Sequence, residues 1–126
     1  MMPETLLAIA LGGAIGGAAR HALGEAVQKL VRGDFPWGTL CVNVSGSLAI
    51  GMLAGFMGIT PADTPAEPAQ LMLITGVLGS FTTVSAFSLQ TLMLYRTGQR
   101  RQAALNILAS TLLCLTGAWL GMVTTL

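Results

Sequence analysis

Residues 75–88 read TGVLGSFTTVSAFS and lie in the middle of an apolar stretch, residues 71–95, that has no charged side chain. Two glycines interrupt the segment, and it carries five hydroxyl side chains from Ser80 to Ser88. Polar backbone groups have no water partner inside a bilayer, so a break in a spanning helix persists only where it is buried against protein or lines a cavity. We therefore predict that the third span breaks here and that the break is the functional centre, on a path for a small polar solute.

Composition restricts the chain to the membrane. Hydrophobic residues make up 53% of its 126 residues and charged residues only 9%, and the mean hydropathy is +0.74. A soluble domain usually has about 25% charged residues. So few charges cannot cover a water-facing surface, and no basic run typical of nucleic-acid binding is present. The composition predicts an integral membrane protein with a single transmembrane domain, residues 1–126.

Four segments are long and apolar enough to span a bilayer, which requires about 20 apolar residues. They lie at about residues 5–23, 38–59, 71–95 and 102–124. We predict an all-α membrane protein of four transmembrane helices with a broken third helix.

The first span is not expected to be a cleaved signal peptide. Glu4 precedes the first apolar run where a signal peptide has a basic residue, so we expect this helix to be retained.

The connections between the spans are short. Residues 25–37 have apolar side chains at helical spacing, which is typical of a short helix at the membrane interface, and Gly33 and Pro36 are expected to end it. Residues 60–68 contain three prolines and are predicted to form a surface loop, whereas residues 96–101 are basic.

The charges of these connections are unequally distributed. With the N-terminus on one side of the membrane, the basic residues of the connections all lie on the other side: Lys29, Arg32, Arg96, Arg100 and Arg101. The positive-inside rule places that side in the cytoplasm and both termini outside.

The predicted spans contain no Asp, Glu, Lys or Arg apart from Arg20, near the end of the first. A proton-coupled carrier normally needs an ionisable group at membrane depth, and a hydrolase needs a nucleophile with a base. We therefore expect a protein that is not an enzyme and that lets a small solute pass. Arg20 either extends to the headgroups or forms an electropositive vestibule for anions.

Polar side chains in the second and fourth spans have two interpretations each. The amide of Asn43 either joins two helices or donates hydrogen bonds to an anion in a pore. Asn106, Ser110 and Cys114 are spaced by four, so they share a helix face. That face is either a packing seam of small residues or a line of donors along a conduit.

The broken span offers groups for both a cation and an anion. An unwound turn would free the carbonyls of Gly79 and Thr82, which could converge on a hard cation because such ions prefer oxygen ligands. The rings of Phe81 and Phe87 could present their positive edges to an anion. The alternative is a packed aromatic residue beside a hinge.

Glycines recur at a spacing of four in the first two spans, as Gly12–Gly16, Gly13–Gly17 and Gly51–Gly55. Such pairs allow helix backbones to approach closely in lipid. The close approach can occur within one chain or between subunits, and the sequence leaves both open.

Three motifs occur together and in order: GGAIGGAAR at residues 12–20, GTLCVNVSGS at 38–47 and GVLGSFTTVSAFS at 76–88. They resemble the signatures of the Fluc, or CrcB-like, fluoride channels, which read roughly GGxxGAxxR, GTxxVNxxGS and GxxGGxTTFSTFS. The resemblance covers all four spans. A glycine-rich helix alone is common, but the joint occurrence of the three motifs is specific.

The resemblance implies a passive, fluoride-selective channel in the bacterial cytoplasmic (inner) membrane, surrounded by lipid, that exports fluoride and lowers its toxicity. Such proteins are antiparallel, dual-topology dimers with two pores and a central structural sodium ion. On this basis the carbonyls of Gly79 and Thr82 would bind the sodium ion. The pore would involve the following residues: Arg20, Asn43, Phe81, Thr83, Val84, Ser85, Phe87, Ser88, Asn106 and Ser110.

The chain departs from the family pattern at three positions. Val84 replaces the first pore phenylalanine, Ala86 replaces a threonine, and Asn106 stands where an aromatic hydroxyl is frequent. Val84 has no ring edge, so conduction is expected to depend on the hydroxyls and on Asn43, with a changed rate or selectivity. The basic bias opposes insertion in both orientations. We nevertheless expect a homodimer, and the alternative is a heterodimer with a homologous chain.

Two other functions compete with this one. A small multidrug-type carrier is also a four-helix dimer, but it depends on a carboxylate within its first helix. Here the acids nearest that span, Glu4 and Glu25, lie outside its apolar core. The other alternative is a non-conducting packing subunit, which has no need of a polar break in the third span.

Overall fold

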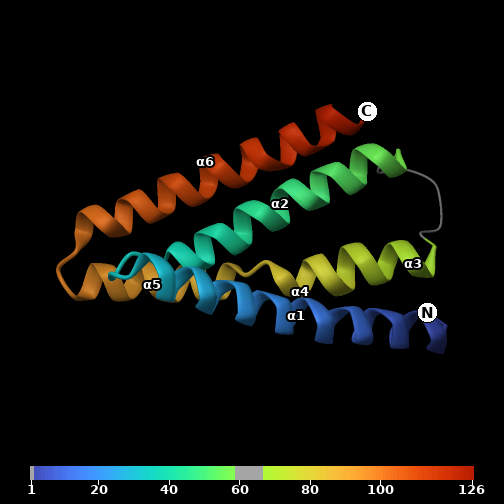
Figure 1. Cartoon of the computed structure of the whole chain (residues 1–126), viewed down its shortest axis with the longest axis horizontal. Coiled ribbons are helices and arrows are strands. Elements are labelled where there is room, and N and C mark those ends of the chain that lie inside the picture. The colour runs from blue at the N-terminus through green and yellow to red at the C-terminus, as the bar shows by residue number, and fades with distance from the viewer. Residues whose placement is uncertain (1, 59–66) are drawn as a thin grey trace.

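In the part of the chain that the structure describes, four helical segments follow one another, and each is long and apolar enough to cross a membrane. The computed structural model describes residues 2–58 and 67–126, so most of the predicted loop at residues 60–68 lies outside the described residues. The elements are α1 (Pro3–Val31), α2 (Trp37–Met57), α3 (Pro68–Leu71), the π-helix η1 (Met72–Leu78), α4 (Gly79–Phe81), α5 (Val84–Arg96) and α6 (Arg100–Thr125), as Figure 1 shows. The third segment comprises α3 to α5. The predicted all-α membrane fold with four spans and a broken third helix is confirmed.

Helix α1 is longer than the sequence predicted. It runs for 29 residues, about 43 Å at 1.5 Å per residue, and so exceeds a hydrocarbon core of about 30 Å. The prediction of a separate interface helix within residues 25–37 is wrong, because residues 25–31, with good helix formers such as Ala, Gln, Lys and Leu, continue α1. The helix ends where Arg32 and Gly33 take positive φ angles of 52° and 113°.

The turn from α1 into α2 is held by the side chain of Gln28. Its Nε2 donates to the carbonyls of Gly33 and Phe35, both at 3.1 Å. Its Oε1 accepts from the amide of Gly38, also at 3.1 Å. One amide side chain thus satisfies three backbone groups of the turn and fixes how α2 leaves α1.

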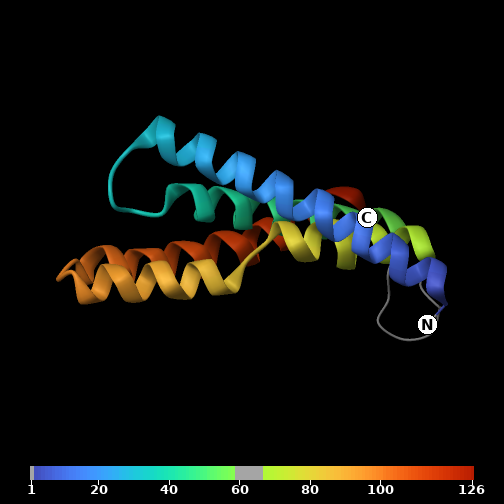
Figure 2. The same cartoon turned by 90° about the horizontal axis from the view of Figure 1, so that it is seen from below.

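The helices form two parallel pairs, in which α1 lies along the first part of the third segment and α2 lies along α6 (Figures 1 and 2). Glycines allow the backbones of each pair to touch. A Cβ atom at Gly16 would clash with the backbone of η1, and one at Gly51 would clash with the backbone of α6. The predicted close approach at Gly12–Gly16 and Gly51–Gly55 therefore occurs within the chain.

The third segment changes its neighbour at the break. Before the break, α3, η1 and α4 pack on α1. After the break, α5 packs mainly on α6. The break is therefore the point at which the chain passes from one helix pair to the other (Figure 2).

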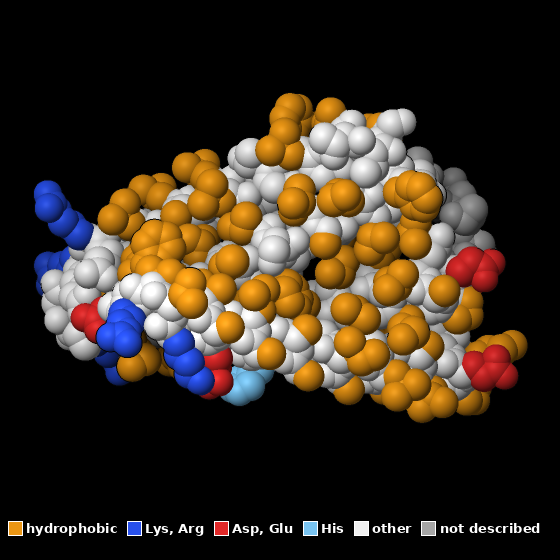
Figure 3. Space-filling model, viewed as in Figure 1, with side chains coloured by type: hydrophobic (Ala, Val, Ile, Leu, Met, Phe, Trp, Pro, Cys, Tyr) orange, Lys and Arg blue, Asp and Glu red, His pale blue; other side chains and the backbone are white. Residues whose placement is uncertain are grey.

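Basic side chains gather at one end of the molecule, as Figure 3 shows. Lys29 and Arg32 lie at the end of α1, Arg96 at the end of α5, and Arg100 and Arg101 at the start of α6. These helix ends lie together because α1 and the third segment run in one direction while α2 and α6 run in the other. We call this the basic end.

We expect Gly16→Ala to destabilise the protein by about 1–3 kcal/mol, the usual cost of overpacking, because the new methyl group would meet the backbone of Val77. Gly17→Ala is the matched control, since no atom lies within 4 Å of the Cβ position there, and both changes gain similar helix propensity. The thermal unfolding midpoint of the purified protein in detergent measures the difference. Equal midpoints for the two variants would contradict the close packing of α1 on η1.

Candidate functional site

The third segment breaks between α4 and α5. Thr82 and Thr83 have extended backbone, with φ/ψ angles of −79°/154° and −150°/120°. The chain therefore crosses from α4 to α5 as an open link, visible in Figure 2. The π-helix of seven residues, Met72–Leu78, precedes α4 and was not predicted from the sequence. Short π-helical turns are frequent near functional sites in other proteins.

The side chain of Asn43, on α2, holds the break in place. Its Nδ2 donates to the carbonyl of Thr83 at 2.9 Å, and its Oδ1 accepts from the amide of Thr83 at 2.7 Å. The interpretation of Asn43 as a link between helices is therefore supported. A primary amide has two N–H groups, and among the residues with described positions no other acceptor takes the second one.

The break removes the helical hydrogen bonds of four backbone carbonyls, those of residues 79–82, and two of these are the predicted cation ligands Gly79 and Thr82. In an unbroken helix, the amide of Thr83 would donate to the carbonyl of Gly79. In the same way, the amide of Ala86 would donate to the carbonyl of Thr82. Here the first amide donates to Asn43 instead, and the second donates to Oγ1 of Thr83 at 3.1 Å. The carbonyls of Gly79 and Thr82 are thus available to a ligand.

Hydrogen-bond donors also remain free at the break. The hydroxyl oxygens of Thr83 and Ser85 lie 3.1 Å apart. Only one of their two protons can lie between these oxygens, so the other is free to bind an acceptor. Helix α5 begins at Val84, and the amides of its first turn point back toward the break, where the helix dipole favours negative charge.

A groove of about 390 Å³, which we call the central groove, opens beside the break. Its walls come from α2, the third segment and α6, and Val84 at its edge is 76% exposed, so the groove is open on the outer face of the chain. Its lining residues are Asn43, Gly46, Ser47, Ile50, Leu78, Gly79, Thr82, Thr83, Val84, Phe87, Ser110, Thr111 and Cys114. Most of the site residues predicted from the sequence therefore meet in one place.

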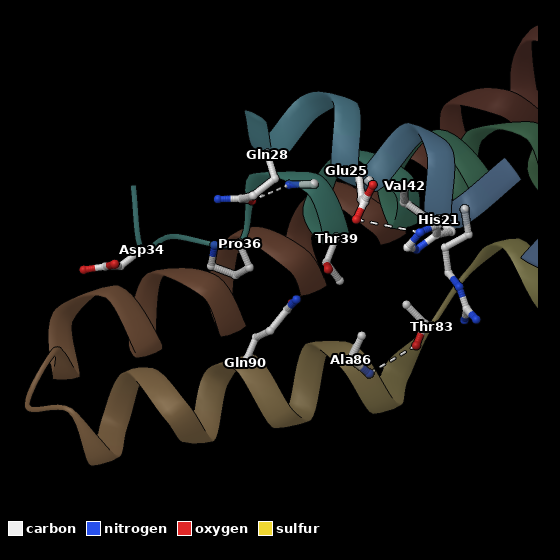
Figure 4. Close-up of a pocket in the computed structure, with 13 residues that line it drawn as sticks. His21, Glu25, Gln28, Asp34, Pro36, Thr39, Val42, Thr83, Ala86 and Gln90 are labelled. Carbon is white, nitrogen blue, oxygen red and sulfur yellow. Dashed lines mark hydrogen bonds and ion pairs between the residues drawn. The ribbon is translucent and has the colours of Figure 1, made fainter. Parts of the chain in front are cut away.

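A second groove, of about 420 Å³, opens at the basic end between α1, α2 and α5, and we call it the end groove (Figure 4). Arg20 lines it and forms no ion pair with the carboxylates in the described part of the chain. Glu25 instead lies 3.7 Å from His21 and 3.6 Å from Lys29. Thr83 lines both the end groove and the central groove, so the two meet at the break.

Polar contacts continue between α5 and α6. Asn106 is 1% exposed, donates to Oγ1 of Thr91 at 2.9 Å and accepts from Ser110 at 3.3 Å. Ser88 and Thr91 lie together in a third groove, of about 550 Å³. Phe87 lines both this groove and the central groove. Groups that can bind an anion therefore run from the basic end to the middle of the spans.

Apart from the buried Asn106, two predicted site residues, Phe81 and Ser85, line none of these grooves. Phe81 packs behind the break, with its Cδ1 3.1 Å from the Cβ position of Gly46. Ser85 is exposed and reaches the site only through its hydrogen bond to Thr83. Both therefore support the break more directly than they line a path.

Sequence reasoning missed several polar residues at the site, and Thr111 in the central groove is one of them. Thr91 could have been found, because it follows Phe87 by four residues on the same helix and so shares its face. Thr39 and Gln90 line the end groove from α2 and α5 (Figure 4). Only the tertiary arrangement of these helices brings them together, so no local pattern predicted them.

Known proteins share this sequence over nearly its whole length. A family model described as "CrcB-like protein, Camphor Resistance (CrcB)" matches residues 7–122. A relative from Hyphomonas neptunium, named "Fluoride-specific ion channel FluC", is 46% identical over 116 residues, which cover 92% of this chain and 91% of the relative. Relatives of the same name from Magnetococcus marinus and Methylocella silvestris are 46% and 44% identical over 115 residues, which cover 91% of this chain and 92% and 88% of the relatives.

These matches confirm the family predicted from the three motifs. The relatives are named as ion channels, so the expectation that the chain is not an enzyme is also confirmed. Four apolar helices together with these relatives confirm a multi-pass protein of the bacterial inner membrane.

We expect Asn43→Leu to destabilise the break, because it leaves the N–H group of Thr83 unpaired, at a cost of about 1–3 kcal/mol, and removes one hydrogen bond from its C=O group. The expected result is a lower thermal midpoint and faster hydrogen exchange at the amide of Thr83. Ser45→Ala is the control, since the hydroxyl of Ser45 bonds only within its own helix, to the carbonyl of Val42 at 3.0 Å. Exchange at Thr83 that stays as slow as in the control would disprove the role given to Asn43.

Proposed function

The chain belongs to the CrcB-like family, and we propose that it is the subunit of a passive, fluoride-selective channel through which fluoride leaves the cytoplasm, which lowers its toxicity. The observation that supports this most directly is the set of uncharged donors at the break. These are the second N–H of Asn43, one hydroxyl proton of the Thr83–Ser85 pair and the amides of Val84 and Ser85, the first two of α5.

Fluoride is small and strongly hydrated, so its transfer into hydrocarbon without replacement of that water costs many kcal/mol. Neutral donors can replace the water in successive steps. A lysine or arginine in their place would bind the anion too tightly for release, and conduction needs sites that are individually weak. A series of amides and hydroxyls without a full charge suits a fluoride path better than a binding site.

We assign the approach to this path to Arg20. Its guanidinium lines the end groove without an ion pair to the described carboxylates, so its field raises the local concentration of anions. Thr83 then connects the end groove to the central groove. Between the break and the basic end, the ring edge of Phe87 and the pair Asn106–Ser110 would add further groups to the path, with Ser88 beside them.

A sodium ion would fit the carbonyls of Gly79 and Thr82, which the break releases. Hard cations take about six oxygen ligands, so the carbonyls of Gly79 and Thr82 would supply part of the set and a second chain the rest. A bound cation would place a fixed positive charge near the path. The exposure of Gly79 on the outer face of the chain is consistent with a shared site of this kind.

We propose that the complete channel is a dimer of antiparallel chains with two pores. The grooves described above lie between the basic end and the middle of the spans, so one chain supplies half of a path. An antiparallel partner seated on the open central groove would bring the same features to the opposite side of the membrane.

Family membership argues against the multidrug-type carrier, and the broken third segment argues against an inert packing subunit.

Liposomes that contain the purified chain are expected to release fluoride rapidly when valinomycin clamps the voltage, and to retain chloride. Reconstitution from detergent inserts chains in both directions, because no cellular insertion machinery acts on them, so antiparallel pairs can form. A fluoride electrode measures the release. Asn43→Asp is expected to slow it at least about tenfold, since a carboxylate repels an anion and cannot donate. Release no faster than from protein-free liposomes would exclude the channel.

Val84→Phe is expected to raise the fluoride rate several-fold, because it adds a ring edge beside the free donors of Thr83. Val84 is 76% exposed, so the larger side chain can be accommodated. Val123→Phe, at a position that is 48% exposed on α6, adds the same ring away from the groove and should leave the rate unchanged. Equal rates in both variants would place residue 84 off the path.

A further inference from the structure

A further groove, of about 500 Å³, opens at the basic end between the α1–α2 turn and α6, and we call it the lateral groove. Three polar side chains line it close to the turn and the start of α6: Arg32, Asp34 and Gln102. Apolar side chains line most of the rest, among them Leu105 and Leu113, which lie about 12 Å apart along α6 at 1.5 Å per residue. The groove therefore has a polar head and an apolar tail, as a phospholipid does.

The lateral groove lies on a different side of α6 from the central groove. Ser110 and Thr111 line the central groove, whereas Leu105 and Ala109 line the lateral groove. At 3.6 residues per turn these two pairs point to different sides of the helix. A second chain on the central groove would therefore leave the lateral groove open to lipid. Trp37 lines the lateral groove and is 42% exposed, as is typical of tryptophans at the membrane–water interface.

The polar groups at the head of the lateral groove have unused binding capacity. Arg32 forms no ion pair with a carboxylate in the described part of the chain. The Oε1 atom of Gln102 is buried and accepts no hydrogen bond from the described residues, although buried polar atoms normally have a partner. The carboxylate of Asp34 accepts one hydrogen bond, from Gln99 at 3.0 Å, and has room for about three more. It points away from the other labelled residues of the end groove (Figure 4).

We propose that the lateral groove binds a phospholipid whose headgroup has a phosphate and a primary ammonium, as in phosphatidylethanolamine. The guanidinium of Arg32 binds the phosphate, for which arginine has a matching set of donors. The ammonium has three N–H groups and donates to the carboxylate of Asp34 and to Oε1 of Gln102. An acyl chain lies along Leu105 and Leu113. The proposal requires only that the protein lies in a membrane, and it does not depend on the channel.

Two related headgroups fit the lateral groove less well. Phosphatidylglycerol has a net negative charge, which the carboxylate of Asp34 repels. Phosphatidylcholine has the same charges as phosphatidylethanolamine, but its quaternary ammonium has no N–H group and leaves Oε1 of Gln102 without a partner. Basic residues next to a membrane attract anionic lipids in general. Asp34 and Gln102 therefore distinguish the lateral groove from the rest of the basic end.

Quenching of tryptophan fluorescence by brominated lipids tests the proposal in a bilayer. Trp119→Phe leaves Trp37, in the lateral groove, as the only tryptophan of the chain. This variant is reconstituted into phosphatidylcholine bilayers with increasing fractions of brominated phosphatidylethanolamine, phosphatidylglycerol or phosphatidylcholine, all with the same acyl chains. Phosphatidylethanolamine should quench Trp37 at a fraction about tenfold lower than phosphatidylcholine does, the usual effect of hydrogen bonds to a charged group. Equal quenching by these two lipids, or stronger quenching by phosphatidylglycerol, overturns the proposal.

Matched variants in the same background locate the lipid. Arg32→Gln and Gln102→Leu should each remove the preference for phosphatidylethanolamine, and the second change sacrifices no hydrogen bond of Oε1 within the described part of the chain. Arg101→Gln removes a charge from the same end, but Arg101 does not line the lateral groove, so the preference should persist. A preference that survives Arg32→Gln, or one that Arg101→Gln also abolishes, shows that the lipid binds elsewhere and overturns the proposal. Fluoride release is a separate measurement, so failure of the channel and failure of the lipid site remain distinguishable.

Discussion

The reciprocal hydrogen bonds between the Asn43 side chain and the Thr83 backbone are the interaction on which the functional centre depends. A spanning helix can be interrupted in hydrocarbon only if the released backbone groups find other partners. One amide side chain satisfies both groups of Thr83 from a neighbouring helix. That leaves the carbonyls of Gly79 and Thr82, and the amides at the start of α5, for ligands rather than for the fold.

Much of the fold could be predicted from the sequence because membrane constraints act locally. The lengths of the apolar runs set the four spans, and glycines and hydroxyls in residues 75–88 indicated the break. Other features depend on contacts between distant segments. The pairing of Asn106 with Thr91, the π-helix at Met72–Leu78 and the groups that Thr39 and Gln90 bring to the end groove have no local signal.

The longer α1 shows how a local interpretation can fail. The apolar residues within 25–31 fit an interface helix, and they also fit a continuation of α1, because both have the same spacing. The structure shows the continuation, because α1 runs unbroken to Val31, and Gln28 then holds the turn that follows with three hydrogen bonds. For the site, the consequence is a longer wall on the end groove at its basic end.

The change of neighbour within the third segment has a mechanical consequence. Its first part is joined to α1 through glycine contacts, and its second part is joined to α6, so the segment belongs to two helix pairs and passes between them at Thr82 and Thr83. A bilayer that becomes thicker or thinner makes spanning helices tilt to match it. A difference in tilt between the two helix pairs would fall on the extended backbone of these two threonines, which couples the candidate site to the thickness of the membrane.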